Sequence, residues 1–335
     1  MTAIPSSGNV PLDRRRFLAL LGVALAWGLL PGCEDQPPSP LRLAAHTWPG
    51  YESLFLAHQM EWLDARLVQL TETTSATDSL RALEQGTVDA AALTLDEVLR
   101  ARSRGIALSI VLVFDISAGA DALLAHPDIP SLKDLAGKRV GVEDGALGAL
   151  MLSEVLQKAG LSLDQVRQVS LTPEHQLDAW KRGEIDAVVT YEPVATQLQE
   201  LGAKRLFDSR EIPDEIVDVL AVRTSILEAR GGKRSVRHLI AAHFQALNHL
   251  HTSPDDFSYR TAAHLKLPAD EVLDAYTGLL LPDVARNHRL LSGSQPVLLG
   301  GARKLSSKLF RDKLIPAEDT LDALLRTEFL PEEAS

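Results

Sequence analysis

The chain has 335 residues, 34 Lys and Arg against 45 Asp and Glu, and a single cysteine. Because a globular domain usually takes about 150 residues, this length predicts two domains. The net charge of −11 argues against a nucleic-acid binder, which needs a basic face, and one cysteine excludes an intramolecular disulfide framework and a cysteine-based zinc ribbon.

Residues 1–32 are predicted to be an export signal. Arg14-Arg15-Arg16 precedes an uncharged apolar run of 14 residues, 17–30. A membrane-spanning helix needs about 20 apolar residues, so this run is typical of a signal peptide. The paired arginines before Phe17-Leu18 favour twin-arginine export, with the general secretory route as the alternative.

The end of the apolar run carries a second signal. Gly32-Cys33 resembles a bacterial lipoprotein lipobox, which implies cleavage before Cys33 and lipidation of its thiol. We therefore expect contact with the membrane through the lipid anchor only. Residues 33–40 are polar and rich in proline and are predicted to be a tether. The acids Glu34 and Asp35 favour retention at the inner membrane.

The body begins with a pattern that returns later in the chain. Residues 41–93 are predicted to form strand, helix, strand, helix and strand, which is typical of an open, mostly parallel sheet. Residues 41–45 correspond to 138–142, and 82–90 correspond to 179–187, both at an offset of 97. Two anchors at one offset predict two similar α/β lobes, with a gap needed between the anchors.

Two segments, near 117–120 and 209–214, are predicted to cross between the lobes as hinges. We assign residues 41–116 and 215–335 to the first lobe and 117–214 to the second. After residue 223 the pattern predicts helices to the end of the chain, with helix starts at Ser253-Pro254 and at Pro268-Ala269. This helical extension is expected to pack on the first lobe.

Several motifs carry a family resemblance. They are Trp48-Pro49-Gly50-Tyr51, Gly86-x-Val88-Asp89-Ala90-Ala91, the run Ser131-Leu132-Lys133-Asp134-Leu135-Ala136-Gly137-Lys138-Arg139-Val140-Gly141, and Gly183-x-Ile185-Asp186-Ala187-Val188-Val189-Thr190-Tyr191-Glu192-Pro193. Roughly residues 41–225 resemble the type II periplasmic substrate-binding proteins of ABC importers, in the nitrate, sulfonate, taurine and thiamine-precursor family. The resemblance implies a two-lobed α/β fold that closes on a small molecule. It also implies an ABC permease and its ATPase as partners, a periplasmic location and no cofactor, and we expect a monomer.

The ligand is expected at the carboxyl ends of the strands, where open parallel sheets bind small molecules. The loops there hold many acids and no Lys or Arg. The predicted contacts are Trp48, Tyr51, Thr73, Thr94, Asp96, Ser117, Asp121, Glu143, Gly145, Tyr191, Glu192 and Asp218. Acids and rings suit an amine or a pyrimidine-like thiamine precursor, whereas a sulfonate or nitrate needs Arg, Lys or bare helix N-termini. Helix capping is the structural alternative for any one of these acids.

The sequence predicts no catalytic residues and no metal site. It contains no G-x-S-x-G, H-E-x-x-H or P-loop motif, and its histidines are scattered. Two other functions stay open. One is an enzyme on the same fold that acts on pyrimidine or menaquinone precursors, and the other is a sensory binding lobe.

Overall fold

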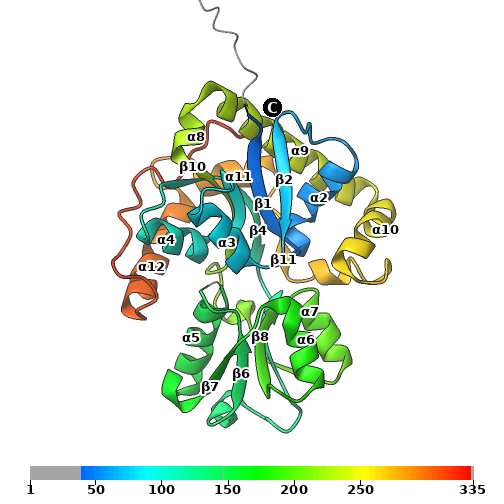
Figure 1. Ribbon diagram of the computed structural model, residues 1–335, viewed down its shortest axis with the longest axis vertical. Coiled ribbons are helices and arrows are strands. Elements are labelled where there is room, and N and C mark those ends of the chain that lie inside the picture. The colour runs from blue at the N-terminus through cyan, green and yellow to red at the C-terminus, as the bar shows by residue number, and fades with distance from the viewer. Residues whose placement is uncertain (1–38, 146, 333–335) are drawn as a thin grey trace, which may run out of the picture. The chain divides into compact units, whose positions relative to one another are not determined.

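The computed structural model describes residues 39–145 and 147–332. Two sheets with helices packed against them confirm the expected α/β class (Figure 1). The predicted signal, Cys33 and residues 33–38 of the tether lie outside the described residues. Within the described residues, no helix is both long and apolar enough to cross a membrane.

The first sheet has six strands in the order β11-β4-β10-β3-β1-β2. Strand β1 pairs in parallel with β2 and β3, whereas β10 runs antiparallel to both β3 and β4. The chain leaves the first sheet at the end of β4 and returns from the second sheet at the start of β10. Strand β10 is therefore antiparallel to β4. The bounds are β1 (Leu41–His46), β2 (Val68–Thr73), β3 (Ala90–Thr94), β4 (Leu108–Ser117), β10 (Val217–Arg223) and β11 (Leu279–Leu280).

Strand β1 shows that the first sheet is buried on both faces. Leu43 and Ala45 belong to one apolar cluster, and Ala44, between them, belongs to another. Successive side chains of a strand point to opposite faces, so a strand covered on both sides is apolar throughout.

Helices cover each face of this sheet (Figure 1). One face carries α2 (Glu52–Gln59), α9 (Arg230–Thr252) and α10 (Pro254–Leu265), which contact one another. The other carries α3 (Ala76–Glu84), α4 (Leu95–Ser103), α11 (Val284–Leu291) and α12 (Val297–Arg311). The short helix α8 (Thr224–Glu228) joins β10 to α9.

The second sheet has five strands in the order β7-β6-β8-β5-β9. Its strands are β5 (Asp121–Ala125), β6 (Arg139–Val142), β7 (Arg167–Ser170), β8 (Ala187–Tyr191) and β9 (Lys204–Asp208). Helix α5 (Leu147–Ala159) packs on one face, and α6 (Pro173–Lys181) and α7 (Val194–Glu200) pack on the other.

The sheet registers confirm the predicted repeat. In the first sheet Leu43 pairs with Ala90, and 97 residues later Val140 pairs with Ala187. The neighbouring ladders pair Arg42 with Gln69 and Arg139 with Arg167, so the offset has grown from 97 to 98. One inserted residue before β7 is therefore the gap that the sequence required.

The two crossings between the sheets lie against each other. Strand β4 leads into β5 through residues 118–120, and β9 leads back to β10 through residues 209–216. The hydroxyl of Ser209 lies 2.8 Å from that of Ser117 and accepts a hydrogen bond of 2.6 Å from the amide of Gly119. Both segments predicted as hinges are thus tied together, while the exact lobe boundaries stay a prediction.

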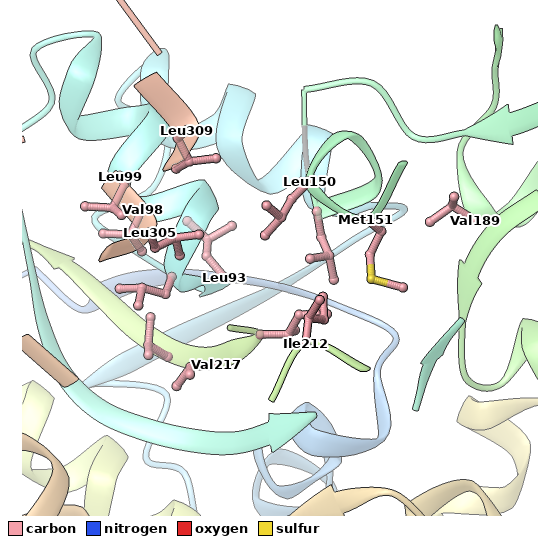
Figure 2. Close-up of a cluster of buried hydrophobic side chains, with 14 of the residues drawn as sticks. Leu93, Val98, Leu99, Leu150, Met151, Val189, Ile212, Val217, Leu305 and Leu309 are labelled. Atoms are coloured by element: carbon pink, nitrogen blue, oxygen red, sulfur yellow. The ribbon is translucent and has the colours of Figure 1, made fainter. Parts of the chain in front are cut away.

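One apolar cluster is shared by the two sheets (Figure 2). Val98 and Leu99 of α4 and Leu305 and Leu309 of α12 belong to it together with Leu150 and Met151 of α5. The cluster also includes Ile212 in the second crossing. The halves therefore meet through dry side chains on the α4, α5 and α12 side.

The tail differs from its prediction in two places. The expected helix at Pro268-Ala269 is wrong: α10 ends at Lys266 in a left-handed conformation, and residues 268–273 form turns before a 3-10 turn over Asp274–Tyr276. The chain is also not helical to its end. Strand β11 pairs with β4, and residues 312–332 are irregular apart from a bridge between Leu325 and Ile110 of β4.

Candidate ligand-binding site

A small cavity lies where the strand ends of the two sheets meet. It has about 290 Å³ of empty space, and both sheets contribute to its wall. Seven of the predicted contacts line it: Trp48, Tyr51, Thr94, Asp121, Glu143, Tyr191 and Asp218. Among the described residues that line the cavity there is no Lys or Arg.

The turn after β1 places two aromatic rings in the wall. Trp48 donates a 3.0 Å hydrogen bond from Nε1 to Oδ2 of Asp115, and Tyr51 donates from its hydroxyl to Oδ1 of Asp218. A Cβ at Gly50 would lie 1.8 Å from Oδ2 of Asp115, so only glycine lets the backbone pass that carboxyl group. The Trp-Pro-Gly-Tyr motif thus has a specific steric reason.

Two of the carboxyl groups face each other across neighbouring strands. Asp115 of β4 and Asp218 of β10 are direct partners in the antiparallel register, and both are almost fully buried. Burial raises the pKa of Asp115 to about 7, and burial together with the charge of Asp115 raises the pKa of Asp218 well above its ordinary value. The pair therefore takes up a proton at higher pH than isolated carboxyl groups do.

The second sheet contributes an aspartate and a tyrosine that are also register partners. Asp121 at the start of β5 is the register partner of Tyr191 at the end of β8. The ring of Tyr191 packs edge to face against Trp48, with 5.5 Å between ring centroids. Burial raises the pKa of Asp121 to about 7, and its Oδ2 has no hydrogen-bond partner among the described residues. An unpartnered buried carboxyl oxygen at a cavity wall is a ready acceptor for a ligand.

Two glutamates join the halves across the cavity. Glu97 accepts a hydrogen bond of 2.9 Å from the amide of Thr94 and one of 3.1 Å from the amide of Leu147 in α5. Glu143, after β6, accepts bonds of 2.9 and 2.7 Å from the amide and the hydroxyl of Thr77 in α3. Burial, with the neighbouring charge of Asp96, raises the pKa of Glu97 to about 8.

Four lining residues were not predicted: His46, Ala76, Glu97 and Leu147. His46 and Glu97 lie in segments that the strand-end rule selects. The rule identifies such a segment but does not say which of its side chains faces the ligand. Burial lowers the pKa of His46 to about 4, which keeps this ring neutral. Ala76 and Leu147 begin helices and carry no chemical signal.

Five predicted contacts lie elsewhere. Asp96 accepts a 2.6 Å hydrogen bond from Thr94 and faces Arg100, and Glu192 accepts a 3.0 Å bond from the amide of Thr196 in the first turn of α7. Glu192 thus follows the capping alternative, whereas Asp96 is held by the side chains of Thr94 and Arg100. Ser117 contacts Ser209 in the crossing, and Gly145 faces a different hollow.

The fifth, Thr73, lines a larger hollow beside the cavity. That hollow has about 1160 Å³ of empty space between the β2 end and helices α6 and α7, and Tyr191 belongs to the walls of both. Tyr191 therefore lies between the cavity and this larger hollow.

The described residues hold no group of three or more His, Cys, Asp or Glu that is arranged to bind a metal ion. The expectation of no metal stays a prediction.

The fold, with two sheets, two crossings and a cavity between strand ends, is that of periplasmic binding proteins. The alkanesulfonate-binding protein SsuA from Xanthomonas axonopodis pv. citri, solved with MOPS bound, matches 87% of this chain and 99% of its own with a TM-score of 0.72 at 20% identity. The desulfurization enzyme DSZB matches 86% of this chain and 97% of its own with a TM-score of 0.60 at 20% identity. At these identities the likeness shows the fold alone.

Sequence comparison gives the family. Residues 63–257, more than half of the chain, match the model of the NMT1/THI5 like family, and the chain belongs to that family. It is 29% identical over 157 residues to the taurine-binding periplasmic protein of Escherichia coli (strain K12), which covers 46% of this chain and 49% of that protein. The chain thus spans about half the length of this relative.

Proposed function

We propose that this protein is the substrate-binding component of an ABC importer and that it works outside the cytoplasm, anchored by a lipid on Cys33. Membership of the family and the names of its relatives support the transport role. The predicted signal and the lipobox-like Gly32-Cys33 support the location. A permease and its ATPase would then be its partners.

We further propose that the ligand is small, nitrogenous and neutral to cationic. The observation that carries this proposal is the wall of the cavity, which combines the carboxyl groups of Glu97, Asp121 and Asp218 with the rings of Trp48 and Tyr191. An ammonium group gains from both carboxylates and aromatic faces once water is excluded. A cation entering the cavity would displace the protons that the raised pKa values retain.

A sulfonate is the competing ligand, because the Escherichia coli relative is named for taurine binding. A sulfonate carries a full negative charge and is normally held by Arg, Lys or free backbone amides. Two amides near the cavity at helix starts, those of Thr77 and Leu147, are already bonded to Glu143 and Glu97. Together with the absence of Lys and Arg among the described lining residues, this disfavours a simple alkanesulfonate.

Capture would proceed by closure of the two halves. Trp48 and Tyr51 come from the first sheet and Asp121 and Tyr191 from the second, so a ligand in the cavity contacts both. A ligand that binds the closed form better than the open form shifts the population towards closure by that difference in affinity.

Isothermal titration with three molecules of matched backbone tests the ligand class. Ethanolamine carries the ammonium group, ethanesulfonate carries the sulfonate, and taurine carries both. We expect binding of amines and of a pyrimidine-like thiamine precursor, and weak or no binding of ethanesulfonate. Tight binding of taurine and ethanesulfonate with no binding of ethanolamine would contradict the proposal.

An enzyme on the same fold is the second candidate, and the likeness to DSZB favours it. Incubation of the protein with any ligand that binds, followed by NMR of the ligand, separates the two functions. An unchanged ligand spectrum supports a binding protein, whereas product signals that grow with time support an enzyme.

A further inference from the structure

A second hollow lies apart from the ligand cavity, between α4, α5 and the segment after α12. It has about 1190 Å³ of empty space, and none of its lining residues lines the ligand cavity. Its aliphatic side chains are Ala149, Leu152, Leu156, Leu161, Leu163 and Leu314. Arg100 of α4 is the basic side chain among the described residues that line it.

Arg100 is buried without a hydrogen bond. Its side chain is 5% exposed, and Nε and Nη2 have no hydrogen-bond partner within the described part of the chain. Asp96 forms an ion pair with Arg100, with 3.4 Å between Oδ2 and Nε, and this oxygen is itself without a hydrogen bond. The ion pair offsets the charge of the guanidinium but leaves Nη2 without an acceptor, and a buried donor without an acceptor is unfavourable unless one binds there.

The other acids of the hollow are engaged elsewhere. Asp312 accepts hydrogen bonds from Ser153 at 3.0 Å and from Arg311 at 3.3 Å. Asp144 accepts from the side-chain amide of Gln168. Neither acid is bonded to Arg100, so the guanidinium stays available to an acceptor that enters the hollow.

We propose that this hollow binds an amphipathic anion, with its carboxylate or sulfonate head on Arg100 and an aliphatic tail along the leucines of α5. The planar guanidinium donates two parallel hydrogen bonds to such a head group, which a lysine does not. The leucines that line the hollow would remove the tail from water. The charge preference is opposite to that of the ligand cavity, so the two sites select different molecules.

The probes are octanoate and octanesulfonate, with octanamide as the uncharged molecule of the same length, titrated calorimetrically into the purified protein. We expect one molecule of either anion to bind per chain and octanamide to bind much more weakly. Shortening the tail from octanoate to heptanoate should weaken binding about fourfold, because each buried methylene contributes to affinity. Whether carboxylate or sulfonate binds more tightly identifies the head group.

Two variants test the place of binding. Arg100→Met keeps the length of the side chain and removes its charge, so octanoate affinity should fall about 10- to 100-fold, with partial recovery in Arg100→Lys. Ala149→Trp fills the hollow and leaves Arg100 intact, so it should abolish binding even if Arg100→Met fails to fold. Tyr191→Ala alters the ligand cavity and the hollow beside it, but Tyr191 does not line the hollow of Arg100, so octanoate affinity should be unchanged.

The outcomes also separate this proposal from the proposed transport function, on which it does not depend. Absence of octanoate and octanesulfonate binding, or binding that Ala149→Trp leaves unchanged, would overturn the second site. Binding that Tyr191→Ala removes and Ala149→Trp does not would place the anion in the ligand cavity instead.

Discussion

Asp89 binds the guanidinium of Arg42 with both of its carboxylate oxygens, at 2.6 Å from Nη2 and 2.9 Å from Nε. The same carboxylate accepts a 3.1 Å hydrogen bond from the amide of Arg42. Ninety-seven residues later Asp186 binds Arg139 through the equivalent three contacts, at 2.6, 3.1 and 2.8 Å. Each pair joins the first strand of a repeat to the residue just before its third strand, so the repeat extends to side-chain chemistry.

The repeated pair predicts two similar losses of stability. Asp89→Ala and Asp186→Ala should each lower the free energy of unfolding by about 1–2 kcal/mol, because charge-assisted bonds are lost but the arginines are partly exposed to water. The effects should add in the double variant, since the pairs share no partner. Urea denaturation measures all three values, and Glu184→Ala, at an exposed ion pair, is the control. If either single variant had the same free energy of unfolding as the wild type, the ion pair removed in that variant would not stabilise the fold.

The aromatic wall predicts a loss of affinity. Trp48→Ala and Tyr191→Ala should each weaken binding of a cationic ligand by about 1–2 kcal/mol, because each ring covers a charge that has left water. Titration calorimetry with the best amine of the panel measures the effect. Tyr259→Ala, at a tyrosine whose side chain is 76% exposed on α10, should change nothing. Unchanged affinity in both cavity variants would exclude these rings from the ligand site.

The buried acids predict how stability depends on pH. The pKa values of Glu97 and Asp121 are about 8 and 7 in the folded protein, so the folded state holds protons that the unfolded chain releases near pH 4. Stability therefore falls as pH rises. Burial lowers the pKa values of His46 and His243 to about 4 and 3, which has the opposite effect, but only below about pH 6.5.

Thermal unfolding between pH 6.5 and 8.5 isolates the carboxyl groups. We expect the Tm of the wild-type protein to fall across this range. Asp121→Asn keeps the shape of the side chain and cannot ionise, so its Tm should depend less steeply on pH. A wild-type Tm that does not fall as pH rises through this range would show that the cavity acids are already ionised in the folded protein.

The contact between Thr77 and Glu143 predicts an effect on closure. Thr77→Val removes the hydroxyl that donates to Glu143 while keeping the shape of the side chain. Solution scattering should show a larger radius of gyration for this variant, and a saturating ligand should reduce it. Thr87→Val removes a hydroxyl bond within the first half and serves as the control. Identical radii with and without ligand, in the wild type and in the variant, would argue against closure.

The lipobox predicts a change in partitioning. Cys33→Ser removes the thiol that is proposed to carry the lipid, so the protein should move from the detergent phase to the aqueous phase of Triton X-114. Partitioning of the wild-type protein into the aqueous phase would contradict lipidation.

The strand-end rule located the cavity from sequence because the carboxyl ends of parallel strands meet at one edge of a sheet. It did not distinguish Asp96 from Glu97, which are neighbours at the start of α4. Their roles depend on where the helix begins: Glu97 turns back to the amide of Thr94, whereas Asp96 faces Arg100 one turn later. Strand β11 has two residues and therefore no periodicity that a sequence could reveal.

The apolar cluster of Figure 2 has a consequence for how a molecule enters. Separating α5 from α4 and α12 would expose hydrocarbon of this cluster at about 25 cal/mol for each Å², whereas the bonds of Glu143 and Glu97 can be exchanged for bonds to water. We therefore expect the protein to open by rotation about the apolar contact between α4, α5 and α12, so that the strand ends that carry Tyr191 move away from the first sheet. A solute would then reach the cavity by passing the ring of Tyr191.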